Sequence, residues 1–392
     1  MSREAITSWL LDQGEQVTGL RELTQALCAQ WLQAGFAVDR VNLGVFALHP
    51  EMAGYAVVWE PELDEAIEIA VRREDMDTPM YLNSPIHWLV ERGGSFVADL
   101  RRPEERARFA VFEEFSERGF EAYFGERIDY GDGGVAVLSV CSRRADRFDT
   151  AQVEGLRAVF PALKLFIHLV ETRRLAETVL ETYLGPDTSK RVLSGQILRG
   201  QGESIEAALW LCDLRGFTQL TSSLSSAELI QVMNDYFDAM AEAVWSHGGE
   251  ILKFMGDAML VVFRIDDQRS AQDACWQAVA AGTTALDDLK RLSSQREAQG
   301  FAPLSAGIAV HLGKVVYGNI GASRRLDFTV MGHAVNVVAR LQTLTAKLDR
   351  PLLLSAAVAE LVGGDLEPMG AFPIKGVREP LVVYTATPSE SG

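Results

Sequence analysis

The segment after residue 206 alternates apolar runs and amphipathic stretches in an order that few folds accommodate. A buried strand (208–213) is followed by a loop and a long helix to residue 249. Two strands (250–254 and 258–263), a helix (270–292), two more strands (304–321) and a helix (333–348) complete the pattern. The order β–α–β–β–α–β predicts a ferredoxin-like α+β fold, with an antiparallel sheet and flanking helices.

Two acidic residues come at strand ends in this pattern. Asp213 ends the first strand, and Asp257 follows Gly256 in the turn of EILKFMGDAMLVVF (250–263). In a ferredoxin-like sheet these ends lie side by side, so the two carboxylates would repel each other unless a cation lay between them. Oxygen-only ligation suits Mg²⁺. Taken singly, Asp213 could cap the next turn and Gly256-Asp257 could be ordinary hairpin chemistry.

Four motifs of this segment resemble those of one enzyme family. DLRGFT, KFMGDAML, RRLDFTVMGHAVNVVARL and IKGVREPLVVY look like the successive motifs of class III nucleotidyl cyclases, in order and at family spacing. The resemblance implies that Asp213, Asp257 and the backbone carbonyl of Leu214 bind two Mg²⁺ ions, for which Mn²⁺ can substitute. It also places Phe217, in DLRGFT, at the substrate.

The resemblance assigns further roles to residues of the later motifs. Asn336 and Arg340 match the transition-state pair Asn-x-x-x-Arg, whose four-residue spacing puts both side chains on one side of a helix. Lys375 matches the lysine that contacts the triphosphate. His333 stands where aspartate is frequent, at a position that varies in the family and is not catalytic, and Phe328 replaces a common tyrosine conservatively.

Two positions bear on the choice of nucleotide. Lys253 matches the base-reading residue, which is lysine in adenylate cyclases and glutamate in guanylate cyclases, and Thr329 matches its partner in the IIIb subgroup. A lysine can donate to N1 of adenine but not to the protonated N1 of guanine. The implied reaction converts ATP to cyclic AMP and pyrophosphate. Three alternatives stay open. Lys253 could be a strand-edge residue whose charged end only reaches solvent, the protein could be a guanylate cyclase, or it could be a catalytically inactive regulatory dimer of the same fold.

Family architecture implies a homodimer. Active sites form between two catalytic domains, one supplying the metal-binding aspartates and the other supplying the base-reading and transition-state residues. This chain contains each element once, so two copies would complete two sites. Lys253 and Asp257 would then serve opposite sites.

The residues before the cyclase-like segment predict a second domain. Helices, strands from residue 38 onward, a short helix at SPIHWLVERGG, an amphipathic helix in 103–119 and a hairpin around residues 131–134 follow one another. This order resembles the GAF family of small-ligand sensory domains, which implies an α/β sensory fold and an unknown small-molecule effector.

A long helical segment from Thr150 to Leu184 follows, with Pro161 predicting a kink or restart in its first half. Its near-heptad apolar spacing fits either a parallel dimer helix or a helix that covers the sheet. We therefore expect a GAF-like regulatory domain (1–170), a helical linker (171–205) and a cyclase catalytic domain (206–388).

The composition limits the classes of partner and the cellular compartment that we expect. A formal net charge of −17 disfavours nucleic acid and anionic lipid as partners, and no apolar stretch is long enough for a membrane span. The four cysteines are scattered without metal-ligand spacing, and the N-terminus lacks a signal-peptide pattern. We therefore expect a cytoplasmic protein.

Overall fold

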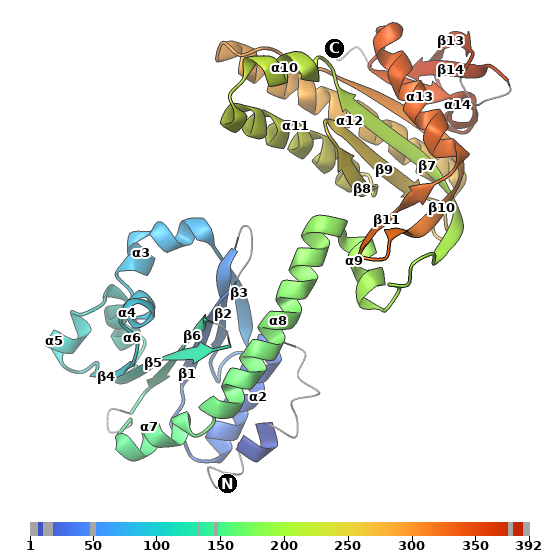
Figure 1. Ribbon diagram of the computed structural model, residues 1–392. Coiled ribbons are helices and arrows are strands. Elements are labelled where there is room, and N and C mark those ends of the chain that lie inside the picture. Colours follow the sequence, from blue (N-terminus) through green and yellow to red (C-terminus); the bar gives the residue numbers. More distant parts are fainter. Residues whose placement is uncertain are drawn as a thin grey trace. The chain divides into compact units, whose positions relative to one another are not determined.

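The computed structural model describes residues 7–10, 19–47, 52–131, 133–144, 148–374 and 379–386. The chain divides into two compact units, Met1–Val179 and Leu180–Gly392 (Figure 1). Within the described residues, no helix combines the length and the apolar character that a membrane crossing requires.

The first unit is built on a six-stranded antiparallel sheet in the order β3-β2-β1-β6-β5-β4. The strands are β1 (Arg40–Phe46), β2 (Met52–Trp59), β3 (Ile67–Arg72), β4 (Ser95–Asp99), β5 (Ala122–Tyr130) and β6 (Gly134–Ser142). The strands predicted from residue 38 onward are therefore confirmed as β1, β2 and β3 within the described residues, as is the hairpin between β5 and β6.

Helices cover parts of both faces of this sheet. One face packs on α2 (Leu20–Gln33), α7 (Thr150–Arg157) and α8 (Phe160–Leu184) through a core that includes Trp31, Leu43 and Leu163. Near the other face lie η2 (Arg73–Asp77), α3 (Pro79–Leu82), α4 (Pro85–Arg92), α5 (Pro103–Arg106) and α6 (Ala110–Glu117). The helix predicted in SPIHWLVERGG is confirmed as α4, which Ser84 caps.

Two helical predictions in this unit have different outcomes. The single amphipathic helix expected in 103–119 is wrong, because Phe109 has an extended backbone (φ −143°, ψ 133°) between α5 and α6. That break lets the Phe109 ring pack with Phe96 and Phe112 in an aromatic cluster. The restart expected near Pro161 is confirmed: α7 ends at Arg157, and Pro161 lies in the first turn of α8, where a missing N–H costs nothing.

The second unit has a larger sheet in the order β13-β14-β12-β10-β7-β9-β8, with β11 paired to β10. Its strands are β7 (Gly202–Leu214), β8 (Glu250–Met255), β9 (Ala258–Arg264), β10 (Ala306–Ala322), β11 (Arg325–Met331), β12 (Leu352–Ser355), β13 (Leu366–Phe372) and β14 (Leu381–Ala386). The strands β10-β7-β9-β8 are antiparallel neighbours, and their order is that of the ferredoxin-like plan. The predicted fold class is therefore confirmed.

Helices cover both faces of this sheet. α10 (Phe217–Ser223), α11 (Ser226–Ser246), α12 (Ala271–Ala298) and α14 (Ala356–Val362) belong to one core, and α13 (His333–Lys347) belongs to the core of the opposite face. α9 (Pro186–Leu193) precedes β7. Ser225 caps α11 and forms a capping box with Glu228.

One strand prediction in this unit is wrong. The segment 304–321, expected to form two strands, is a single long strand, β10, which pairs along its length with β7 and turns into β11 only after Ala322. The glycines at 313 and 318 within this strand allow close packing. A Cβ at Gly313 would collide with Ala334 of α13, and one at Gly318 would collide with the backbone of Gln201 and Gly202.

Candidate active site

The structure brings Asp213 and Asp257 together at one edge of the second sheet. Asp213 is the penultimate residue of β7 and pairs with Ala258 of β9. Asp257 immediately precedes Ala258, in the two-residue turn between β8 and β9, where Gly256 adopts a positive φ of 68°. The expected hairpin and the expected meeting of the two strand ends are both confirmed, because the sheet order makes β7 and β9 neighbours.

The electrostatics of this pair show that the carboxylates interact strongly. The pKa of Asp213 is raised to about 6, chiefly by burial and also by a hydrogen bond to Asp257 and the negative charge of Asp257. Two carboxyl groups in hydrogen-bond contact cannot both be ionised at low energy without a cation.

A divalent metal ion fits these donors. Both side chains supply only oxygen, the donor that Mg²⁺ prefers. The Leu214 side chain is buried, which leaves its backbone carbonyl as the group available beside Asp213. No cluster of three or more acidic, histidine or cysteine side chains suited to a metal occurs in the described ranges. The protein would therefore supply two carboxylates and a carbonyl, and water and phosphate would complete the coordination.

Phe217 lies close to the pair along the chain. Gly216, with a φ of 73°, turns the chain after β7, and Phe217 begins α10. Its ring is half-buried and packs against the core below the sheet. Phe217 therefore fixes the loop that follows Asp213 and Leu214.

Lys253 lies on β8 in a different environment. A bulge between Ile251 and Lys253 shifts the register of β8 against β9. The half-buried Lys253 lines a pocket of about 430 Å³ together with Phe254, Asp327 and Phe328. The strand that carries the second base-reading candidate, β11, therefore lies beside Lys253.

Thr329 is buried on β11, and its hydroxyl oxygen has no hydrogen-bond partner among the described residues. An unpaired buried hydroxyl is costly, so this position is suited to a polar group that the chain itself does not supply. Asp327 precedes it by two residues and therefore lies on the same face of β11. Asp327 also lines the pocket that contains Lys253.

Asn336 and Arg340 are both exposed, one helical turn apart on α13. α13 runs along β10, with Ala334 over Gly313 and Thr345 over Gly307. Gly307 pairs with Asp213. Thr345 therefore marks the part of α13 that is level with Asp213. Asn336 precedes Thr345 by nine residues, which places Asn336 about 13 Å away from that level along the helix axis. One chain therefore does not bring Asn336 to its own aspartates.

Lys375, the remaining candidate, lies outside the described residues.

A polar cluster beneath β8 was not predicted from the sequence. Tyr317 donates to the carboxylate of Glu250 at 2.6 Å, Thr188 of α9 donates to the same oxygen at 3.2 Å, and Arg191 lies over the Tyr317 ring. This cluster ties α9 to the start of the strand that carries Lys253. Its members are far apart in sequence, so only the three-dimensional fold reveals them.

The second unit is thus a ferredoxin-like α+β domain with paired carboxylates at one sheet edge. Residues 202–386 match the family model described as "Adenylate and Guanylate cyclase catalytic domain". The matching family is the one that the motifs predicted.

Relatives with curated names are similar over the same part of the chain. An adenylate cyclase of Anabaena cylindrica is 33% identical over 160 residues, which cover 41% of this chain and 31% of the relative. Adenylate cyclase 1 of Rhizobium meliloti (strain 1021) is 30% identical over 183 residues, which cover 46% of this chain and 27% of the relative. The chain thus spans about a third of the length of these relatives.

A solved structure supports the fold. The structure of a bacterial light-regulated adenylyl cyclase matches with a TM-score of 0.50 and 22% sequence identity, covering 75% of this chain and 93% of that one. The GAF-like nature of the first unit stays a prediction.

Proposed function

We propose that the protein is an adenylate cyclase that converts ATP to 3′,5′-cyclic AMP and pyrophosphate. The observation that carries the proposal is the contact between Asp213 and Asp257 in a domain of the cyclase family. The names of the two curated relatives favour adenylate over guanylate cyclase.

In the proposed reaction, the ribose 3′-oxygen bonds to the α-phosphorus as the bond to the leaving pyrophosphate breaks, and the hydroxyl proton is lost. Asp213, Asp257 and the Leu214 carbonyl would hold two Mg²⁺ ions, or Mn²⁺ in their place. When bound, these ions would acidify the 3′-hydroxyl and neutralise phosphate charge.

The side chains of α13 and Lys375 have separate roles in this proposal. Arg340 would donate to the charge that develops on the α-phosphate, a type of interaction worth roughly 10²–10³-fold in rate. Asn336 would orient the ribose by a hydrogen bond. Lys375 would stabilise the leaving pyrophosphate. Phe217 would shape the loop at the substrate.

Adenine recognition is assigned to Lys253 and Thr329. The Lys253 ammonium would donate to N1 of adenine, and the Thr329 hydroxyl would accept from the exocyclic amino group. The unpaired, buried Thr329 hydroxyl supports a role in binding a ligand. The acidic Asp327 in the Lys253 pocket is the strongest argument for testing GTP as well, since a carboxylate can accept from guanine.

A homodimer would complete the site. In one chain, Asn336 lies about 13 Å along α13 from the level of Asp213 and cannot reach it. A second copy would bring its own Asn336 and Arg340 to the aspartates. Phe254 and Met255, next to Asp257, are 52% and 42% exposed, as expected of side chains that a partner covers.

α8 offers a second contact between copies. Its exposed residues recur at alternating spacings of four and three, which is the pattern of a coiled-coil seam: Leu165, Leu169, Thr172, Ala176, Val179 and Tyr183. We propose that residues 171–205 link a GAF-like regulatory domain (1–170) to the catalytic domain (206–388). An effector bound by the first domain would change the pairing of α8 helices and so the geometry of the catalytic dimer.

The compartment proposed is the cytoplasm. Cys28, Cys141, Cys212 and Cys275 are all buried and unpaired, which fits a reducing environment.

The test is an assay of the purified chain with Mg²⁺ or Mn²⁺ and with ATP or GTP in parallel. Cyclic AMP formed in preference to cyclic GMP supports the proposal. Preferential cyclic GMP would refute the base assignment, and no product from either nucleotide under any metal condition would favour the inactive regulatory dimer.

A further inference from the structure

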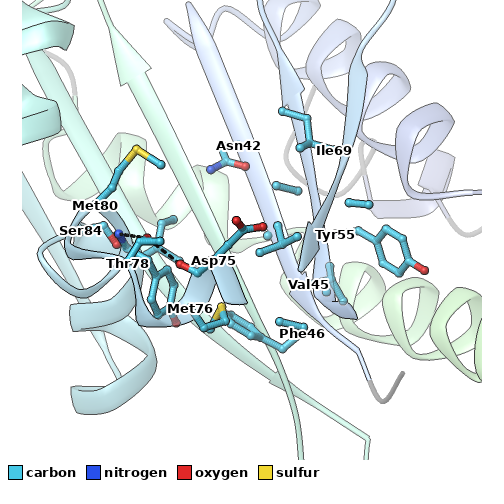
Figure 2. Close-up of a pocket in the computed structure, with 18 residues that line it drawn as sticks. Asn42, Val45, Phe46, Tyr55, Ile69, Asp75, Met76, Thr78, Met80 and Ser84 are labelled. Atoms are coloured by element: carbon cyan, nitrogen blue, oxygen red, sulfur yellow. Dashed lines mark hydrogen bonds between the residues drawn. The ribbon is translucent and has the colours of Figure 1, made fainter. Parts of the chain in front are cut away.

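The first unit contains a cavity of about 420 Å³ between its sheet and the segment formed by η2, α3 and α4 (Figure 2). It lies on the sheet face opposite the core that contains Leu43 and Val57. Its volume falls in the range of small-molecule sites, roughly 300–1,000 Å³.

The cavity exists because the strands below it carry small residues. Gly44 pairs with Ala56, and both line the cavity with Gly54 of β2. Gly54 has a separate constraint, since a Cβ there would collide with the backbone of Val45. A Cβ at Gly44 would meet nothing closer than ordinary van der Waals contact. The space at Gly44 and Ala56 is therefore open rather than needed for packing.

The walls of the cavity are mainly apolar. Phe46, Val71 and Met76 line it, and Ile69 and Met80 beside it are 49% and 85% exposed. A ligand that covered these side chains would remove apolar surface from water.

Two side chains of the cavity present acceptor oxygens. The side-chain oxygen of Asn42 is buried and has no partner among the described residues. The carboxylate of Asp75 lines the cavity from the opposite wall, and Figure 2 shows both groups directed toward the same space. No lysine, arginine or histidine of the described chain lines the cavity.

The Thr78 and Ser84 hydroxyl groups of the lining are already engaged. The Thr78 hydroxyl donates to the Asp75 backbone carbonyl at 2.7 Å and accepts from the Tyr81 amide, and the Ser84 hydroxyl accepts from the His87 amide at 3.1 Å. One oxygen of Asp75 accepts from the Arg72 amide at 2.8 Å. The unmet requirement is therefore for a donor near the Asn42 oxygen and the other oxygen of Asp75.

We propose that this cavity binds a small, largely apolar amine, whose ammonium group donates to Asp75 and Asn42 while its apolar part covers Phe46, Ile69 and Met80. A carboxylate or phosphate ligand would face Asp75 without a balancing cation. The binding site is independent of catalysis, and its test needs no cyclase activity.

The test is calorimetric titration of the full chain with matched pairs of probes that share a ring and differ in charge. Tryptamine is paired with indole-3-propionate, and phenethylamine with 3-phenylpropionate. We expect at least one amine to bind about tenfold or more tightly than its carboxylate counterpart, the size expected of a hydrogen bond to a charged group. No binding by either amine, or equal binding by the paired carboxylate, overturns the proposal.

Variants locate the binding. Asp75→Asn should weaken the amine about tenfold or more, and Ala56→Leu should abolish its binding by filling the floor of the cavity. Glu74→Gln is the matched control, because Glu74 is a neighbouring exposed acid that does not line the cavity. Thermal unfolding checks that each variant is folded. If Ala56→Leu does not fold, the binding result for Asp75→Asn, a change at an exposed position, decides the test. Undiminished amine binding by Asp75→Asn overturns the proposal.

Discussion

If each catalytic site takes its aspartates from one copy and its Asn336–Arg340 pair from the other, two inactive variants should restore activity to each other. The perturbations are Asp257→Ala in one preparation and Arg340→Ala in the second. Each alone should be inactive, because every site of either homodimer lacks one essential group.

The expected recovery follows from counting sites. Random exchange of subunits makes half of the dimers mixed, and each mixed dimer has one site with both Asp257 and Arg340 intact. An equimolar mixture should therefore reach about a quarter of the wild-type rate. The geometric basis is the axial distance of about 13 Å between Asn336 and the level of Asp213 within one chain.

The assay is cyclic AMP formation after the two preparations have been mixed and allowed to exchange subunits. A mixture of Asp213→Ala with Asp257→Ala is the matched control. Both of those substitutions affect the aspartate side of the site, so their mixed dimers contain no intact site and should stay inactive.

Two results would refute the reasoning. Absence of recovery in the first mixture, when exchange is demonstrated with differently tagged copies, would show that one chain completes its own site. Equal recovery in the control mixture would show that activity returns for a reason unrelated to sharing of the site.

Three further predictions concern the base, the carboxylate pair and the helix seam. Lys253→Glu should lower kcat/KM for ATP about 10–100-fold and lower that for GTP less, measured with both nucleotides; an unchanged preference contradicts the role of Lys253. The pKa of Asp213 is raised to about 6 in the folded state. The metal-free folded protein therefore binds more protons than the unfolded chain between about pH 4 and pH 6, and its stability falls as the pH rises through that window. Asp213→Asn should therefore raise the Tm of metal-free protein by about 2–4 °C at pH 8 and leave it nearly unchanged at pH 4, by calorimetry; an equal shift at both values would contradict the electrostatic origin. Leu169→Glu should weaken dimerisation about tenfold or more, by analytical ultracentrifugation, whereas the same change at the exposed Lys164, outside the seam, should not.

The sequence predicted the second unit well because its pattern is locally encoded. Asp213 ends an apolar run, and Gly256-Asp257 separates two others, so strand ends and turn could be placed without knowing the contacts. The ferredoxin-like order then determined that the two acids would meet.

The errors arose where packing overrides local signals. The segment 304–321 was predicted to form two strands, but it is one strand, β10, in which Gly313 and Gly318 allow α13 and the segment before β7 to approach closely. Phe109 fits a helical pattern, but its ring enters an aromatic cluster only if the backbone is extended there.

Long-range side-chain contacts could not be predicted from the sequence. The position of Asp327 beside Lys253 depends on the β10–β11 turn, and the bond between Tyr317 and Glu250 joins residues 67 positions apart. The cavity above Gly44 and Ala56 likewise depends on strand register, because small residues form a hollow only where several meet on one face.

The central claim is that Asp213 and Asp257 together hold the metal ions that act on ATP. The most direct measurement is the initial rate of cyclic AMP formation by the purified chain, with saturating Mg²⁺ or Mn²⁺, for the wild type and for Asp213→Ala and Asp257→Ala. We predict that the wild type forms cyclic AMP and that each variant falls to the background rate while it remains folded. A normal rate in either folded variant would contradict the account.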